Sequence, residues 1–253
     1  MIASLPDKAR RLARCLLVPS ARRAVLAAAL VASGAGAKAD ILGAEYADPT
    51  TRYAHGVLGD AIEYGSLLIH TDRMDGLTFK MALPQDRVFE DLAPRLVDVD
   101  GDGDVEVVVV ESQANTGAAL AIYDDTGKIA STPHIGTRNR WLAPIGAADF
   151  DGDGHIELGY IDRPHLAKTL RLWRFQDGAL SEVAALGGLT NHRIGEDFIS
   201  GGVRDCAGRP EMVVATANWQ RLAAIRFDGS ELSADDIGPF AGPASFKAAL
   251  ACQ

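Results

Sequence analysis

A short acidic motif that occurs twice, with the same internal spacing, most constrains how this 253-residue chain folds. Residues 94–112 read PRLVDVDGDGDVEVVVVES, and residues 144–162 read PIGAADFDGDGHIELGYID. In each copy an apolar stretch leads into a loop of aspartates and glycines, and a run of β-branched or aromatic residues follows. This pattern is typical of two strands joined by a tight loop. A further strand is predicted after each copy, at residues 118–125 and 169–178.

Two weaker copies extend the repeat over most of the chain. A third copy covers residues 198–229, and Glu211 stands there where the first two copies have Glu106 and Glu157. A possible fourth copy, residues 55–84, has the strands but a shortened loop. Repeats of this length with several strands are typical of propeller blades. The sequence therefore predicts an all-β fold, a small β-propeller of about four blades. Five blades or an open array are the alternatives.

Both strong copies place carboxylates at alternate positions of the loop. Counted from the first aspartate, positions 1, 3, 5 and 9 are acidic in both loops, and position 7 is aspartate in one and histidine in the other. These residues are Asp98, Asp100, Asp102, Asp104 and Glu106 in the first loop, and Asp149, Asp151, Asp153, His155 and Glu157 in the second. Calcium takes about six to eight oxygen ligands on a flexible loop. We therefore expect two Ca²⁺ sites, with a backbone carbonyl as the ligand at position 7.

The loops differ from a standard EF-hand, because position 12 is Val109 in one and Tyr160 in the other. The motifs VDVDGDGDVEVVVV and AADFDGDGHIELGYI instead resemble the FG-GAP / VCBS repeat family, whose calcium-loop blades also occur in integrin α-subunit propellers. The resemblance implies that the acidic side chains at positions 1, 3, 5 and 9 of both loops are calcium ligands, together with the carbonyls of Asp104 and His155. The third copy has lost two of the acids, and we expect no calcium there.

The resemblance also implies that the calcium loops lie on one face and the connections between blades on the other, which often binds partners. Those connections carry arginine, asparagine, histidine and tryptophan as a candidate ligand face: Arg87, Arg138, Asn139, Arg140, Trp141, Asn191, His192 and Arg193. Arg140 and Trp141 suit an acidic or sugar-like group, through bidentate hydrogen bonds and stacking. Alternatively, these residues pair with the acidic residues at 90–91 and 196–197 and hold the blades together.

The N-terminal segment has the features of an export signal. Basic residues precede the apolar run Ala24–Ala32, and Ala37-Lys38-Ala39 is an A-x-A cleavage motif. This predicts a signal peptide at residues 1–39 and a mature repeat domain at residues 40–253; an amphipathic N-terminal helix is the alternative. Both Sec and twin-arginine export stay open.

The remaining domain is strongly acidic, which argues against binding of nucleic acid by bulk charge. No other segment is apolar enough to cross a membrane. In the periplasm or outside the cell we expect Cys206 and Cys252 to form a disulfide; two unpaired buried thiols are the alternative.

These features together predict a monomeric, periplasmic or secreted calcium-binding protein that acts as a binding or scaffold module for an unknown protein or glycan partner. The sequence has no H-E-x-x-H, G-x-S-x-G or phosphate-loop motif, and no catalytic residue is assigned. One alternative is a propeller enzyme, a hydrolase or lyase that acts on a glycan or phosphate ester at the candidate ligand face. Another is a purely structural role in an envelope assembly.

Overall fold

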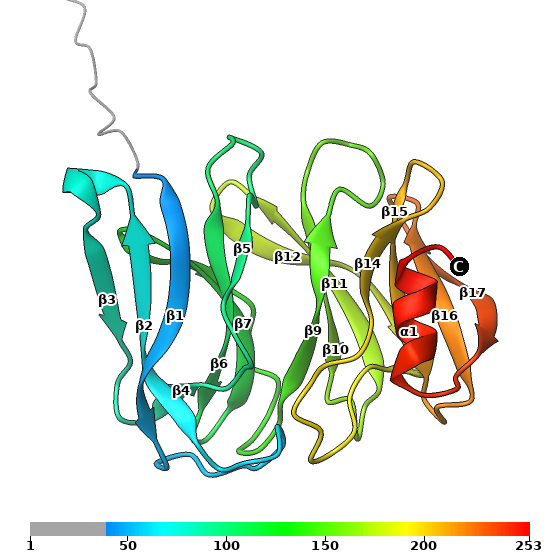
Figure 1. Ribbon diagram of the computed structural model, residues 1–253, viewed down its shortest axis with the longest axis horizontal. Coiled ribbons are helices and arrows are strands. Elements are labelled where there is room, and N and C mark those ends of the chain that lie inside the picture. Colours follow the sequence, from blue (N-terminus) through cyan, green and yellow to red (C-terminus); the bar gives the residue numbers. More distant parts are fainter. Residues whose placement is uncertain (1–38) are drawn as a thin grey trace, which may run out of the picture. The chain divides into compact units, whose positions relative to one another are not determined.

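The computed structural model describes residues 39–253, which form seventeen β-strands and one α-helix (Figure 1). The predicted all-β fold is confirmed. The predicted signal peptide, residues 1–39, lies outside the described residues except for Ala39, so it stays a prediction. No helix within residues 39–253 is both long and apolar enough to cross a membrane.

The strands follow one another as four repeat units, and the first two units share one eight-stranded sheet. The first unit contains β1 (Ile41–Thr50), β2 (Glu63–Thr71) and β3 (Thr78–Ala82), with a short 3₁₀ turn at Arg73–Asp75. The second contains β5 (Arg95–Val97), β6 (Glu106–Gln113), β7 (Gly117–Asp124) and β8 (Gly127–Ser131). Strand β4 (Arg87–Phe89) pairs with both β2 and β6 and thereby joins the two units.

The third and fourth units each form a sheet of their own, and all their strand pairs are antiparallel. The third unit contains β9 (Leu142–Ala148), β10 (Glu157–Asp162), β11 (Thr169–Gln176) and β12 (Ala179–Gly187). The fourth contains β13 (Leu189–Thr190), β14 (Gly202–Asp205), β15 (Pro210–Thr216), β16 (Arg221–Phe227) and β17 (Leu232–Pro239). Helix α1 (Pro243–Leu250) follows.

Successive units pack face to face, which explains why the central strands read as continuous apolar runs. Side chains of a strand alternate between its two faces. In β6, Val107 and Val109 pack against the first unit, whereas Val108 and Val110 pack against the third. In the last sheet, the buried residues Val213 and Ala215 of β15 pack instead with side chains of α1. The helix therefore covers the sheet face against which a further unit would pack.

The first and last units lie at opposite ends of the row in Figure 1. Four apolar core clusters occur within residues 39–253: one between each pair of successive units, and one between the last sheet and α1. The cluster between the second and third units also takes in Val57 of the β1–β2 loop, with Ile199, which precedes β14, packed against it. The units are therefore stacked like propeller blades, and α1 rather than another sheet closes one end.

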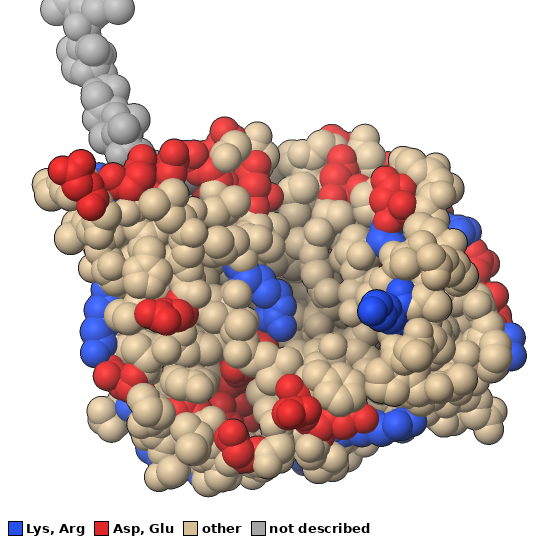
Figure 2. All heavy atoms as spheres, in the orientation of Figure 1, with Lys and Arg blue, Asp and Glu red and all other residues tan. Residues whose placement is uncertain are grey.

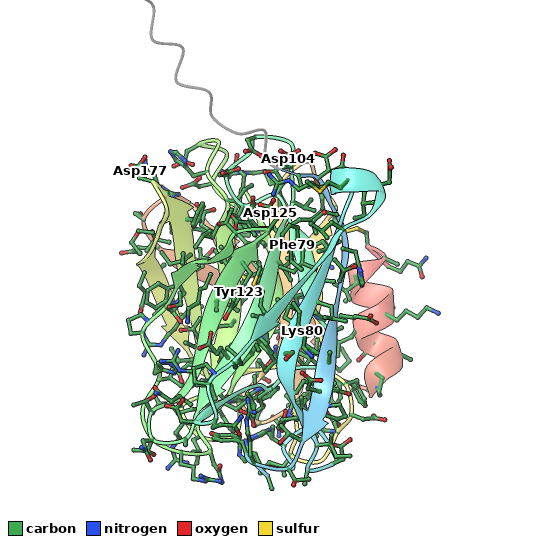
Figure 3. All side chains as sticks on the ribbon, turned by 90° about the vertical axis from the view of Figure 1, so that its left-hand side faces the viewer. Phe79, Lys80, Asp104, Tyr123, Asp125 and Asp177 are labelled. Carbon is green, nitrogen blue, oxygen red and sulfur yellow. A yellow bond between two sulfur atoms is a disulfide. The ribbon has the colours of Figure 1, made fainter. Side chains whose placement is uncertain are left out.

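The loops of the repeats lie at two ends of the strands. The β5–β6 and β9–β10 loops, which carry the acidic motifs, share the upper end in Figure 1, and acidic side chains gather along this edge in Figure 2. Asp104 and Asp177 also lie at this end in Figure 3. The β1–β2 loop lies at the other end, where Val57 accepts a backbone hydrogen bond from Gly195 (3.1 Å). The β1–β2 loop, which the sequence suggested as a shortened fourth copy of the acidic loop, therefore lies at the wrong end of the strands to be its counterpart.

Cys206 and Cys252 form a disulfide, which confirms the predicted pairing. Their Cα atoms are 5.6 Å apart, and 46 residues separate them in sequence. The bond ties the loop between β14 and β15 to the residues that follow α1.

Candidate metal centre

The first acidic loop is shaped by hydrogen bonds between carboxylates and the backbone. Asp98 accepts the N–H of Gly101 at 2.7 Å and that of Gly103 at 3.1 Å, one on each carboxylate oxygen. Both glycines have positive φ, which a residue with a Cβ adopts only with strain. At the far side of the loop, the buried Glu106 accepts the N–H of Val99 at 3.1 Å. The loop therefore turns tightly around its own carboxylates.

The second acidic loop repeats this arrangement. Asp149 accepts the N–H of Gly152 at 2.7 Å and that of Gly154 at 3.0 Å, again on separate oxygens. Glu157 is fully buried and accepts the N–H of Phe150 at 3.0 Å. Two segments about fifty residues apart thus fold into loops of the same shape, as their shared spacing predicts.

Each loop brings three carboxylates together. Oxygen atoms of Asp98, Asp100 and Glu106 lie within 4.8 Å of one another, and so do oxygen atoms of Asp149, Asp151 and Glu157. An all-oxygen donor set of this kind fits a hard cation such as Ca²⁺.

The other predicted ligands belong to the same loops but not to these clusters. Asp102 accepts the N–H of Asp104, and Asp153 accepts the N–H of His155, both at 2.9 Å. Their carboxylates therefore also shape the backbone of the loop. The proposed role of the carbonyls of Asp104 and His155 stays a prediction.

Residues 98–160 match the family model of the FG-GAP-like repeat. This FG-GAP-like segment begins at Asp98, the first aspartate of the first acidic loop, ends in β10, and contains both acidic clusters. The resemblance stated from the sequence is thereby confirmed over this segment.

Among solved structures, the crystal structure of an exotype rhamnogalacturonan lyase matches this chain in part. The likeness covers 79% of this chain and 48% of that one, at 14% sequence identity and a TM-score of 0.44. The chain thus spans about half the length of that enzyme. The search of curated protein sequences gave no match.

An arginine from a neighbouring strand enters the second loop of the FG-GAP-like segment. Arg174 of β11 contacts Asp151 at 2.7 Å, Asp153 at 2.8 Å and Glu157 at 2.6 Å. Burial raises the pKa of Asp151, but hydrogen bonds, above all from Arg174, hold it below its ordinary value. For Glu157 burial prevails, and its pKa is raised despite the bonds from Phe150 and Arg174.

The third copy of the loop joins β14 to β15 in the fourth unit, after the FG-GAP-like segment, and its glutamate pairs with two arginines. Glu211 contacts Arg204 at 2.6 Å and Arg226 at 2.8 Å. Asp205 still accepts a backbone N–H, that of Gly208 at 2.6 Å, so the turn persists without the acidic cluster.

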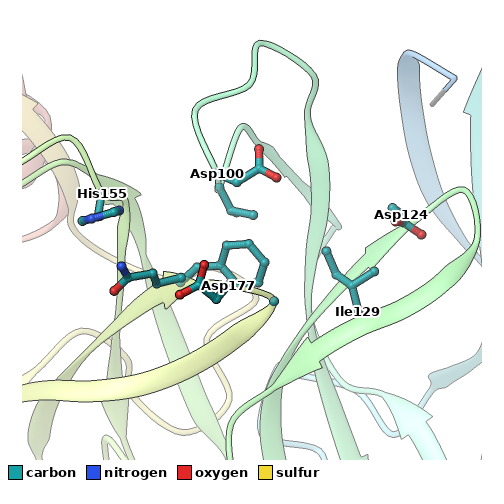
Figure 4. Close-up of a pocket in the computed structure, with 9 residues that line it drawn as sticks. Asp100, Asp124, Ile129, His155 and Asp177 are labelled. Atoms are coloured by element: carbon teal, nitrogen blue, oxygen red, sulfur yellow. The ribbon is translucent and has the colours of Figure 1, made fainter. Parts of the chain in front are cut away.

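A cavity of about 520 Å³ opens beside both acidic loops (Figure 4). Its lining combines apolar side chains with acidic groups and one histidine: Val99, Asp100, Asp124, Ile129, His155, Phe175, Gln176, Asp177 and Gly178. The residues come from both acidic loops and from two hairpins of the second and third units. No local sequence pattern could identify it, because packing alone brings these segments together.

Three residues of the candidate ligand face are buried at the opposite end of the strands. Trp141 donates its indole N–H to the backbone oxygen of Glu90 at 2.8 Å. His192 lies 3.0 Å from a ring nitrogen of His165, and its other ring nitrogen lies 3.0 Å from the backbone oxygen of Glu196. Asn191 donates to backbone oxygens of β9. These side chains therefore hold loops together within the protein.

The arginines of the candidate ligand face also have partners within the protein. Arg87 pairs with Glu111 at 2.6 Å. Arg138 lies over the ring of Tyr53, 5.1 Å from its centroid, and Arg193 lies over that of Trp219 at 4.2 Å. The backbone N–H of Asn139 donates to the Tyr53 hydroxyl at 2.9 Å, and the carbonyl of Arg140 accepts from Ala118 at 2.8 Å. Arg138, Asn139 and Arg193 keep exposed surface.

Two further histidines lie at this end and were not singled out from the sequence. His55, paired with the buried Glu90, and His165 line a small recess beside Trp141. Burial and the neighbouring His192 lower the pKa of His165 to about 4.

Proposed function

We propose that this protein is an exported calcium-binding repeat protein that acts as a binding or scaffold module in the periplasm or outside the cell. The observation that carries this proposal is the pair of three-carboxylate clusters at equivalent places in two successive repeats. Without a cation the carboxylates repel one another, so a bound Ca²⁺ stabilises the loop that holds it. The FG-GAP-like match over both loops and the Cys206–Cys252 disulfide support the calcium and the exported location.

The positions of the loops suggest what calcium does for the scaffold. Asp151 of the second loop touches the fourth unit, because its backbone oxygen accepts from Arg209 at 3.1 Å. Asp100 of the first loop lines a cavity together with Phe175 of the third unit. Each loop thus stands at a junction between successive units. Calcium in these loops would fix the units relative to one another and leave the row rigid enough to present a binding surface.

Counting bound metal tests the proposal. Equilibrium dialysis of the full chain against calcium should show up to two equivalents, with one site lost in Asp98→Asn/Glu106→Gln and another in Asp149→Asn/Glu157→Gln. Asp205→Asn is the matched control, since Asp205 shapes the same kind of turn but belongs to no acidic cluster. Wild-type protein without bound metal at millimolar calcium would refute the calcium role.

The partner surface requires its own experiment. The candidate ligand face keeps exposed arginine and asparagine side chains at residues 138–139 and 193. Arg138→Ala and Arg193→Ala should weaken binding in a glycan and protein array probed with the calcium-loaded chain. Lys247→Ala, exposed on α1, is the control. Unchanged binding in both arginine variants would place the partner elsewhere.

Catalysis at the same end is the second candidate function. It is favoured by His165, whose pKa of about 4 leaves it neutral at physiological pH, beside His55 in the recess. Turnover of a glycan or phosphate ester that is abolished in His165→Ala, with unfolding unchanged, would favour this function over binding.

A further inference from the structure

Arg174 sits where a cation would bind in the second acidic loop. Its side chain is only 17% exposed and reaches the loop from β11, 17 residues after Glu157. One terminal nitrogen contacts both Asp151 and Glu157, and the other contacts Asp153. The guanidinium thus makes direct contacts with three of the four carboxylates of this loop. Two of them, Asp151 and Glu157, belong to the three-carboxylate cluster that could hold a metal ion.

The contacts with Arg174 occupy oxygens that a metal ion would need. Glu157 accepts from Arg174 on Oε1, and its Oε2 accepts the N–H of Phe150. Both oxygens of this glutamate are therefore engaged. Oε1 is contacted by two nitrogens of Arg174, Nε and Nη2. Calcium bonds to carboxylate oxygens at roughly 2.3–2.6 Å, so an ion that binds Oε1, or both oxygens of Glu157, must displace the guanidinium.

The position opposite the loop glutamate differs from one unit to the next. Glu157 pairs directly with Arg174 across β10 and β11. In the fourth unit Met212 pairs with Ile225, so Arg226 lies opposite Glu211. In the second unit Val107 pairs with Tyr123, so the residue opposite Glu106 is Asp124. The residue opposite the loop glutamate is therefore an aspartate in the second unit and an arginine in the third and fourth units.

The fourth unit shows what an arginine at this place does. Its loop has lost two of the acidic positions, and Arg204 and Arg226 neutralise the remaining buried glutamate. The third unit combines the full acidic loop with the arginine.

We propose that Arg174 is the resident cation of the second acidic loop, and that Ca²⁺ binds fully there only by displacing the guanidinium. This inference rests on the proposed calcium role. Arg174 lowers the calcium affinity of the loop, because each ion bound must break charge-assisted hydrogen bonds to Asp151 and Glu157. In return it keeps the loop ordered at low calcium, since the buried Glu157 retains a positive partner. The second loop then binds calcium only at higher concentrations than the same loop would without Arg174.

A background that lacks the first site isolates the second loop. Asp98→Asn/Glu106→Gln removes two cluster ligands of the first loop, so that calcium titration of the full chain reports on the second. Adding Arg174→Gln to this background should tighten calcium binding at least tenfold, measured by isothermal titration calorimetry. Arg174→Lys keeps the charge without the forked geometry and should give an intermediate affinity. Arg171→Gln is the matched control on the same strand, because Arg171 contacts Asp162 and Glu182 outside the loop.

Thermal unfolding separates an effect on calcium from a general loss of structure. Without calcium, Arg174→Gln should unfold at a lower temperature than its background, because Glu157 loses its partner. Saturating calcium should restore most of the difference. Equal calcium affinity with and without Arg174 would overturn the inference while the calcium role stands. No calcium binding in any variant, including the wild type, would overturn both.

Discussion

At the scale of single residues, Glu63 makes the stability of the protein depend on pH. This glutamate opens β2, is only 4% exposed and lies near Glu90, Asp60 and Asp91. Burial, with the charge of Glu90 next in importance, raises its pKa to about 9. The folded protein therefore keeps a proton that the unfolded chain releases near pH 4.5. Its contribution to stability is fully present below that pH and is lost as the pH rises towards 9.

Glu63→Gln removes this titration and should therefore stabilise the protein increasingly as pH rises. The free energy of unfolding in urea, measured at pH 5, 7 and 9, should diverge between variant and wild type by up to about 1.4 kcal/mol per pH unit. Glu45→Gln, at an exposed residue of β1, is the control. A difference between Glu63→Gln and wild type that is constant across this range would contradict the raised pKa.

Residue roles were predictable where they depend on neighbours along the chain. The acidic loops could be predicted from the sequence, because their acidic residues lie within nine successive positions. Arg174 could not, because its place in the second loop follows from the register of β10 against β11. His55 and His165 were missed for the same reason: they meet only after distant loops pack together. Trp141 and His192 were predicted to belong to a ligand face, but packing between units buries both side chains.

At the scale of secondary-structure elements, helix α1 protects the outer face of the last sheet. Phe246 is 4% exposed and packs with Val213, Ala215 and Leu222. Phe246→Ala should lower the free energy of unfolding by about 3–5 kcal/mol, because it removes a buried ring and leaves a cavity. Chemical denaturation measures this loss. Lys247→Ala, on the exposed side of the same helix, should change it by less than about 0.5 kcal/mol. Equal losses in both variants would show that α1 does not cover the sheet.

The disulfide supports the same helix from its far end. A bridge between residues 46 positions apart removes chain entropy from the unfolded state, which corresponds to about 4 kcal/mol. Cys206→Ala/Cys252→Ala should therefore lower the free energy of unfolding by a similar amount. The wild type under reducing conditions should match the variant, and reductant should not affect the variant. A loss below about 1 kcal/mol would contradict this entropic stabilisation.

Elements were predictable to the extent that both of their faces are buried. Strand β6 is buried along nearly its whole length and reads as an apolar run. Strand β1 lies at a sheet edge and has one buried residue, so it lacks both the run and a clear alternation, and the sequence did not indicate it. Strand β4 has three residues and exists because it bridges two neighbouring strands.

At the scale of the whole described domain, the number of repeats followed from the sequence but their closure did not. About four repeat units were predicted from the copies of the repeat, with five or an open array as alternatives, and four are present in residues 39–253. How the ends of the row are covered depends on side chains from different repeats. The packing of α1 on the last sheet is such a contact, and repeat spacing carries no information about it.

Calcium should stabilise the entire row of units rather than the loops alone. The acidic loops stand at junctions between units that share apolar cores, so loosening a junction weakens the packing of both neighbours. A site saturated a hundredfold above its dissociation constant contributes about 2.7 kcal/mol, which raises the unfolding midpoint of a domain this size by about 5–10 °C. Differential scanning calorimetry in calcium and in chelator should show a single transition that shifts by at least this amount. Magnesium should shift it less, because its strict octahedral geometry and reluctant dehydration fit a flexible carboxylate loop poorly. Identical midpoints in calcium and chelator would mean that the acidic loops contribute nothing to the cohesion of the units through metal binding.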